Sequence, residues 1–265
     1  MRRFYFVLAL ICGSAICAGA QNFYVTPIVI DLDGRNFEGA FTDVPHGVTF
    51  GFIHAGEPIE MAWTESGRNV GFLVLNRHGN QTPDPRDEHT NSHQWFQILE
   101  QWRKQAASGK TAVDDPATFH VASGREMFGN FTNQPMSSRQ AEQAEAMAAR
   151  GEPWEPNGFL ALSFFDRKEN GGNENGMIDA GDLVFSHLRV WVDTAHNGRS
   201  EDGKMYTLRD LGIQSIGLNY AESDRVDRNG NHLRYTGQVV MANGSRVQPQ
   251  IADVFFRAVR NAPPN

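Results

Sequence analysis

The chain has 265 residues, with 24 Lys and Arg against 31 Asp and Glu, which gives a formal net charge of −7. This negative charge argues against the phosphate backbone of nucleic acid, or an anionic membrane, as the main partner. Hydrophobic residues make up 40% and charged residues 21%, so the chain can bury an ordinary core in one large domain or two small ones.

The start of the chain has the pattern of an export signal. Arg2 and Arg3 precede an apolar run and a group of small residues ending at residue 20. We therefore expect residues 1–20 to be a signal peptide, and the protein to be secreted or periplasmic. Its loss leaves 22 Lys and Arg against 31 Asp and Glu, a net charge of −9. Both cysteines, Cys12 and Cys17, lie in this segment, so the exported protein has no disulfide.

Residues 21–80 form a predicted N-terminal β region. Four runs rich in β-branched and apolar residues are separated by glycine, proline and acidic turns. They predict strands at residues 26–32, 48–53, 59–64 and 70–76. The short connections indicate an antiparallel sheet or meander.

Residues 81–122 are predicted to be an inserted helical segment. After a polar stretch broken by proline, four apolar residues recur at helical spacing: Trp95, Ile98, Leu99 and Trp102. This pattern predicts one helix that begins near Asn91 or Ser92. Residues 123–156 then form a predicted linker with an exposed helix at 138–150.

Residues 157–212 are predicted to form a paired helix-loop-helix unit. Apolar segments at 158–165, 182–191 and 208–212 alternate with two polar loops, which is the order of paired calcium loops. Residues 213–260 form a predicted C-terminal β hairpin region. Its expected strands lie at 213–220, 232–241 and 246–256, with Asn243-Gly244 as a hairpin turn.

The first polar loop has the oxygen-bearing residues that calcium prefers. An EF-hand loop offers oxygens at positions 1, 3, 5, 7, 9 and 12 and has glycine at position 6. With Gly176 at position 6, the predicted ligands are Asn173, Asn175, the carbonyl of Met177, Asp179 and Asp182. Position 1 falls on Gly171, so we assign that role to Asp166, with residues 167–171 as a bulge.

A simpler interpretation of the same residues stays open. Asn, Asp and Gly are also the residues of tight turns, and Asp179 with Asp182 are equally suited to capping a helix. The second polar loop gives weaker metal candidates: Asp193, Asn197 and Glu201. Ala195 offers no side-chain oxygen there, and Lys204 places a positive charge where a bidentate acid belongs.

Several stretches carry a resemblance to a known family. They include NGFLAL from residue 157, GGNENGMID from residue 171, VFSHLRVWVD from residue 184 and PIVIDLDG from residue 27. In these stretches the chain resembles secreted bacterial proteins with EF-hand-like calcium loops, related to modules of repeats-in-toxin proteins. The resemblance implies a secreted calcium binder without a known enzymatic activity. Departures such as Arg35, where an acidic residue is expected, imply that several loops are degenerate.

These features predict an α+β fold in which short antiparallel β elements flank a paired EF-hand-like helix-loop-helix unit. The predicted function is export and binding of Ca²⁺ as a structural staple, without catalysis, nucleic-acid binding or membrane insertion. A protein or glycan partner is not identified by the sequence. The first alternative is a calcium-independent adhesion or partner-binding module with decayed loops.

A second alternative is a secreted zinc-dependent hydrolase. His89 and His93 are spaced to share a zinc ion if both are helical, and His78 and His120 lie nearby. A helix that starts at Asn91 or Ser92 leaves His89 outside it. The chain has no His-Glu-x-x-His or Gly-x-Ser-x-Gly pattern.

Overall fold

The computed structural model describes residues 21–54, 57–75, 92–109, 119–129, 156–242 and 246–260. In these ranges the chain forms two α-helices, α1 (Ser92–Ala107) and α3 (Gly158–Leu162), and a 12-stranded sheet. The strands are β1 (Gln21–Val25), β2 (Ile28–Asp31), β3 (Val48–His54), β4 (Glu57–Met61), β5 (Val70–Leu75), β6 (Met177–Asp179), β7 (Leu188–Val192), β8 (Lys204–Thr207), β9 (Ile213–Gly217), β10 (Ala221–Val226), β11 (His232–Met241) and β12 (Arg246–Arg260).

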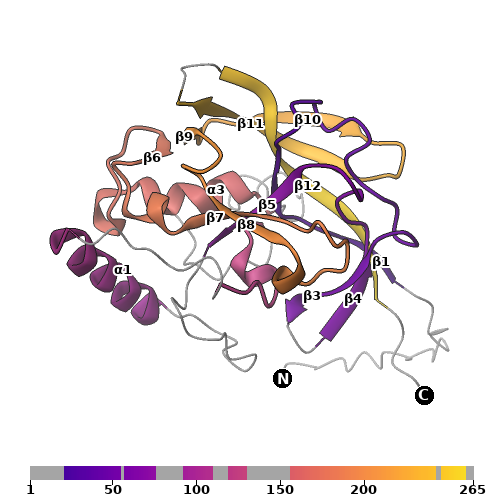
Figure 1. The fold of residues 1–265 in the computed structure, drawn as a ribbon, viewed down its shortest axis with the longest axis horizontal. Helices are drawn as coiled ribbons and strands as arrows, with labels where there is room; N and C mark the ends of the chain where they lie inside the picture. Colours follow the sequence, from indigo (N-terminus) through magenta and orange to yellow (C-terminus); the bar gives the residue numbers. More distant parts are fainter. Residues whose placement is uncertain are drawn as a thin grey trace, which may run out of the picture.

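The long strand β12 organises the sheet. It pairs with β11 and β2, and its C-terminal part pairs with β1 and β4. The main path runs β6-β9-β11-β12-β2-β5-β7-β8, with antiparallel neighbours throughout. Figure 1 shows α1 at the edge of the molecule. The prediction of an α+β fold is therefore wrong, because the described chain is mostly antiparallel β sheet.

The middle strands are buried on both faces. On β5, Leu73 enters one hydrophobic core and Phe72 enters the other; on β7, Val190 and Trp191 divide in the same way. Every residue of β5 and β7 is buried. A strand covered on both faces is typically apolar throughout rather than alternating. β5 fits this pattern, and β7 fits it apart from the buried Arg189, whose Nη1 donates to the backbone oxygens of Ser186 and Leu188.

Different elements cover the two cores. The first core is closed by α3, by the 3₁₀ turn η2 (Ser163–Asp166) and by the buried face of α1, which supply Phe159, Phe165, Leu99 and Trp102. The second core is closed by the β3–β4 hairpin and by aromatic residues such as Trp63. The loop that follows η2 therefore starts from the rigid cover of the first core.

The predicted EF-hand-like pair is absent from the described chain. Residues 182–191, predicted to be its second helix, form the 3₁₀ turn η4 (Leu183–Ser186) and then β7, which pairs with β5 and β8. Residues 208–212 form turns instead of a helix. The error has a physical cause. A short, continuously apolar run shows no periodicity, so the sequence pattern does not distinguish a strand buried on both faces from a buried helix.

Other predicted elements agree with the structure. The helical spacing around Leu99 and Trp102 corresponds to α1, and the strands predicted near residues 48, 59, 70, 213, 232 and 246 correspond to β3, β4, β5, β9, β11 and β12. The signal peptide at 1–20, the exposed helix at 138–150 and the Asn243-Gly244 turn lie outside the described residues.

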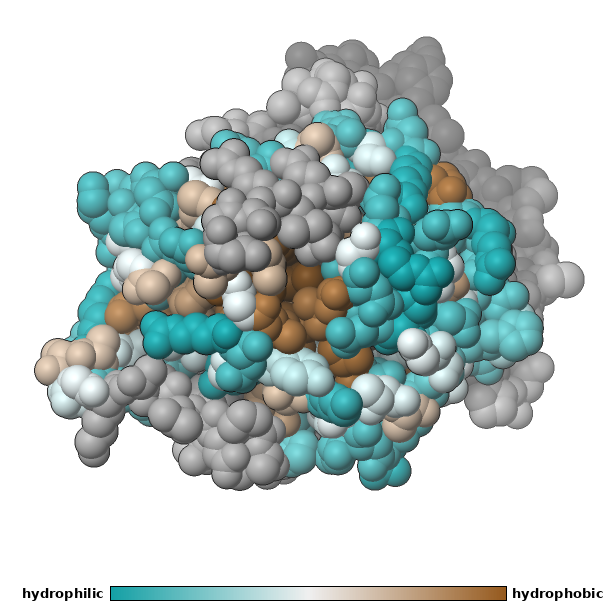
Figure 2. Space-filling model, turned by 45° about the horizontal axis from the view of Figure 1, so that its top comes forward, coloured by the Kyte–Doolittle hydropathy of each residue, from teal (hydrophilic) through white to brown (hydrophobic). Residues whose placement is uncertain are grey.

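Among the described residues, no helix is both long and apolar enough to cross a membrane. Figure 2 shows one face of the molecule, where hydrophilic residues surround a smaller hydrophobic area.

The start of α3 offers a test of how this cover is held. Asn157 is buried, and its Oδ1 accepts the backbone N–H groups of Phe159 and Leu160 at 2.9 and 3.2 Å. We expect Asn157→Ala to lower the free energy of unfolding by about 1–2 kcal/mol, measured by urea denaturation. Asn157→Ser keeps an acceptor and should lose less. Equal losses in the two variants would contradict a capping role.

Candidate functional site

The acidic loop, residues 166–182, connects η2 to η4. Asp166 ends η2, and its Oδ1 and Oδ2 accept the backbone N–H groups of Asn175 and Gly176 at 3.1 and 3.0 Å. The residues between them include the 3₁₀ turn η3 (Lys168–Asn170), which occupies the segment predicted to be a bulge. The fold thus places Asp166 beside the residues predicted to share its metal ion.

Asp182 is the most buried carboxylate of the acidic loop, with 3% of its surface exposed. Its two oxygens accept the N–H groups of Asn173 and Asp179 at 3.0 and 2.7 Å. Burial raises the pKa of Asp182 to about 6; these two N–H donors oppose the rise, and the charges of Asp166 and Asp179 add to it. Since the folded pKa exceeds the ordinary 3.8, this group's contribution to stability is lost as the pH rises through about 6.

The side chains of Asp179, Asn173 and Asn175 form one hydrogen-bonded group. Asp179 Oδ1 accepts Asn173 Nδ2 at 3.1 Å, and Asp179 Oδ2 accepts Asn175 Nδ2 at 2.8 Å. Met177 begins β6 and pairs with Gly217 of β9. All six predicted ligands of the first loop therefore lie in one short segment, and the amide N–H groups already neutralise part of the charge on Asp179.

The oxygen-bearing residues of the acidic loop are of the types that calcium binds, but its carboxylates are not arranged around a common point. Within the described ranges, no three His, Cys, Asp or Glu side chains converge closely enough to hold a metal ion. Calcium also takes amide and carbonyl oxygens, which Asn173, Asn175 and Met177 supply. An ion bound at Asp179 would have to displace the two amide N–H donors from its carboxylate.

In the second polar loop, residues 193–204, Asp193 is anchored by a distant tryptophan. Its Oδ2 accepts Trp63 Nε1 at 2.8 Å and the N–H groups of Asn197 and Gly198 at 3.0 and 2.7 Å. Its Oδ1 is buried and has no hydrogen-bond partner among the described residues. The structure therefore joins Asp193 to Asn197, two of the weaker metal candidates.

The third weaker candidate lies elsewhere. Glu201 is exposed on the 3₁₀ turn η5 (Ser200–Asp202), whereas Asn197 Nδ2 donates to Asp202 Oδ2 at 2.8 Å. The sequence interpretation missed both Asp202 and Trp63. Asp202 was detectable as the acid next to Glu201, but 130 residues separate Trp63 from Asp193.

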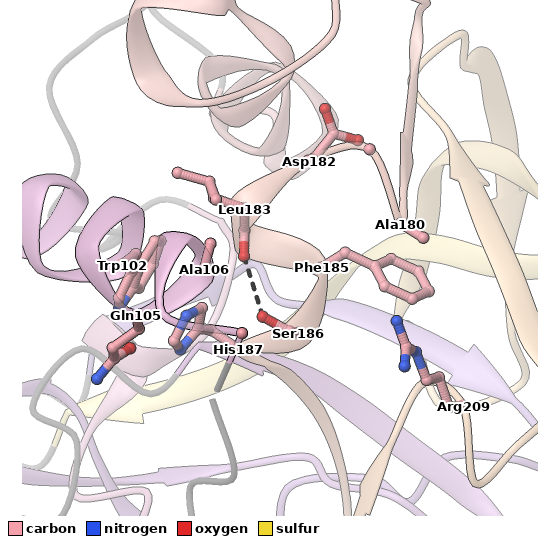
Figure 3. A pocket seen from close by; sticks show the side chains of 12 residues that line it. Trp102, Gln105, Ala106, Ala180, Asp182, Leu183, Phe185, Ser186, His187 and Arg209 are labelled. Atoms are coloured by element: carbon pink, nitrogen blue, oxygen red, sulfur yellow. Dashed lines mark hydrogen bonds between the residues drawn. The ribbon is translucent and has the colours of Figure 1, made fainter. Parts of the chain in front are cut away.

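A cavity of about 270 Å³ lies beside the acidic loop, between α1, η4 and Arg209 (Figure 3). On its wall the ring of His187 stacks on that of Trp102, with centroids 4.0 Å apart. From the same helix, Arg103 Nη2 donates to the backbone oxygen of Glu169 at 2.5 Å. Helix α1, which lies within the predicted insertion, therefore contacts the acidic loop through Arg103 and the end of η4 through Trp102.

The zinc hypothesis falls mainly outside the described residues. His78 and His89 are not described, nor is the side chain of His93. His120 is described and half-buried, in the segment 119–129. A zinc-dependent hydrolase therefore stays an untested prediction.

The fold and the loops define the class as a mostly antiparallel β-sheet protein with two acidic, amide-rich loops. The chain belongs to the SPM domain family, whose model matches residues 101–257. It is 37% identical over 228 residues, or 86% of its length, to the iron-regulated protein FrpA of Neisseria meningitidis serogroup C. It spans only 15% of that protein's length. The matched family is not an EF-hand family, so the resemblance to EF-hand-like calcium binders is wrong.

Proposed function

We propose that this chain is an exported protein whose acidic loop takes up one calcium ion as a structural staple, without an EF-hand. The observation that carries the proposal is the burial of Asp182 near the charges of Asp166 and Asp179, which raises its pKa to about 6. A divalent cation among these carboxylates removes their repulsion and stabilises the folded state by mass action.

The ligand chemistry and the export pattern support this choice of ion. Carboxylate, amide and carbonyl oxygens are hard ligands, which calcium prefers, and the residues of the acidic loop offer no thiolate or imidazole. Export directed by a signal peptide at residues 1–20 would bring the protein to a compartment rich in calcium. Extracellular modules bind the ion at about 10⁻⁴ to 10⁻³ M, which suffices there.

A calcium titration followed by thermal unfolding tests the proposal. With a dissociation constant near 10⁻⁴ M, about 10 mM calcium stabilises the fold by about 2.7 kcal/mol. The Tm of the purified protein should therefore rise by about 5–10 °C. Asp179→Ala should abolish this rise.

The matched control is Asp224→Ala. Asp224 is an exposed aspartate on β10, and its Oδ1 lies 3.9 Å from Arg234 Nη1. This variant should respond to calcium as the wild type does. A wild-type Tm that calcium leaves unchanged, with magnesium as the ionic-strength reference, refutes the proposed ion.

One observation favours the second candidate, a calcium-independent partner-binding module. Each of Asp166, Asp179 and Asp182 already accepts N–H groups of its own loop, so the loop keeps its shape through internal donors. On this view calcium has no effect on the Tm. Deletion of residues 81–122 would then remove partner binding. It would also remove Leu99 and Trp102 from the first core and lower the Tm, so the quantity to compare is the change in Tm that calcium produces, which the deletion should leave unaltered.

A further inference from the structure

A second acidic segment, the β2 loop (residues 31–38), surrounds a buried arginine. Asp31 ends β2 and is fully buried. Its Oδ1 accepts the N–H group of Asp33 at 3.0 Å, and its Oδ2 accepts those of Arg35 and Phe37 at 3.0 and 2.7 Å. The backbone therefore wraps around one carboxylate, and a buried carboxylate needs a nearby positive charge.

Arg68 supplies that charge from the turn before β5, and 8% of its side chain is exposed. Its Nε donates to Asp33 Oδ2 at 2.7 Å, and its Nη1 donates to the carbonyl oxygen of Glu38. Its Nη2 is buried without a hydrogen-bond partner among the described residues and lies 3.7 Å from Asp31 Oδ1. The guanidinium thus faces two carboxylates and one carbonyl at the same time.

The backbone holds this arginine in register with the loop. Asn69, the next residue, donates its N–H to Asp33 Oδ2 at 3.1 Å, and its carbonyl accepts the N–H of Leu32 at 2.9 Å. Arg68 therefore reaches the loop because the strands β2 and β5 are neighbours in the sheet. The backbone bonds of Asn69 thus fix the position from which the Arg68 side chain reaches the two carboxylates.

We propose that the β2 loop is a cation-binding loop whose resident cation is the Arg68 guanidinium. The oxygens that face it, from Asp31, Asp33 and Glu38, are the hard donors of a calcium or magnesium site. A tethered guanidinium keeps the loop folded at any metal concentration. Its removal leaves a vacant site for a divalent cation. The proposal does not depend on calcium binding by the acidic loop.

The test uses Arg68→Ala in an Asp179→Ala background, so that a response of the acidic loop cannot be mistaken for one at the β2 loop. Without metal, loss of the buried pair should lower the Tm by about 6–15 °C. About 10 mM calcium should restore at least half of that loss, because the ion replaces the missing charge. A loss that calcium, magnesium and added guanidinium ion all leave unrestored overturns the proposal.

Arg225 provides the matched control. This arginine also contacts the loop, through Nη1 to Asn36 Oδ1 at 2.8 Å and Nη2 to Asn36 O at 2.6 Å. Its guanidinium binds neutral oxygens, so Arg225→Ala in the same background should lower the Tm without making it respond to calcium. A calcium response of equal size in both variants would contradict a site specific to Arg68.

Two further substitutions keep the test decisive if Arg68→Ala does not fold. Arg68→Lys retains the charge without the planar fork, and Arg68→Met retains similar bulk without charge. The lysine variant should be the more stable by several degrees and should ignore calcium, whereas the methionine variant should respond to it. Equal Tm values for the two variants would show that Arg68 acts through packing alone.

Discussion

Trp63→Ala is expected to lower the free energy of unfolding by about 3–5 kcal/mol, which is a large part of the stability of a typical domain. The indole is fully buried in the second core. Its ring centroid lies 4.5 Å from that of Phe72 and 5.7 Å from that of Trp191. Removal of the indole leaves a cavity lined by aromatic rings. The rings lie on strands of the sheet, which cannot move together to close the cavity. Urea denaturation monitored by circular dichroism measures the loss.

Trp63→Phe separates the ring from its hydrogen bond. The phenyl group keeps most of the packing but removes the Nε1–H donor from the buried carboxylate of Asp193. We expect a loss of about 1–3 kcal/mol, because the remaining N–H donors must then compensate the charge alone. The loss should shrink when Asp193→Asn is combined with it. A Trp63→Phe protein as stable as the wild type would mean that the bond contributes nothing.

Gly172→Ala is expected to cost about 3 kcal/mol and to separate Asp166 from the rest of the acidic loop. A Cβ at residue 172 would lie 2.1 Å from the carbonyl carbon and 2.2 Å from the carbonyl oxygen of Asp166. Both are backbone atoms, so one of the two chain segments has to move. The bond from Glu174 N to Asp166 O, 2.8 Å long, should weaken, and its amide proton should exchange faster with solvent.

Gly176→Ala is the matched control in the same loop. Gly176 has a φ of +79°, but no atom lies within 4 Å of the position that a Cβ would take, so alanine there meets backbone strain and no clash. The expected loss is about 1 kcal/mol. If the two alanine variants were equally stable, the close approach at Gly172 would not be what shapes the loop.

Local pattern was sufficient for the elements with a single buried face. The helical spacing of Leu99 and Trp102 identified α1, because an amphipathic helix repeats its apolar residues at that interval. The strand β11 alternates buried and half-exposed residues, and its pattern was equally readable. Residues 188–192 were assigned to a helix, because the sheet buries both faces of β7 and so erases the alternation. β5 is buried on both faces as well, but the turn residues that flank it still marked it as a strand.

The acidic loop was predictable as a group of residues but not as a geometry. Asp166, Asn175, Asp179 and Asp182 lie within one short segment, so any compact turn brings them together. Which way their oxygens point depends on the N–H groups that the folded turn presents. Those groups turn the carboxylates toward the loop's own backbone.

The sequence by itself determined which segments are apolar enough to be buried and where the oxygen-rich loops lie between them, because both follow from residue type and short spacing. Only the tertiary structure decided that these segments form one antiparallel sheet with two cores. It also decided that Trp63 reaches Asp193 and Arg68 reaches Asp31. Such contacts depend on which strands become neighbours, and that is settled by the burial of both sheet faces at once, a property of the whole chain.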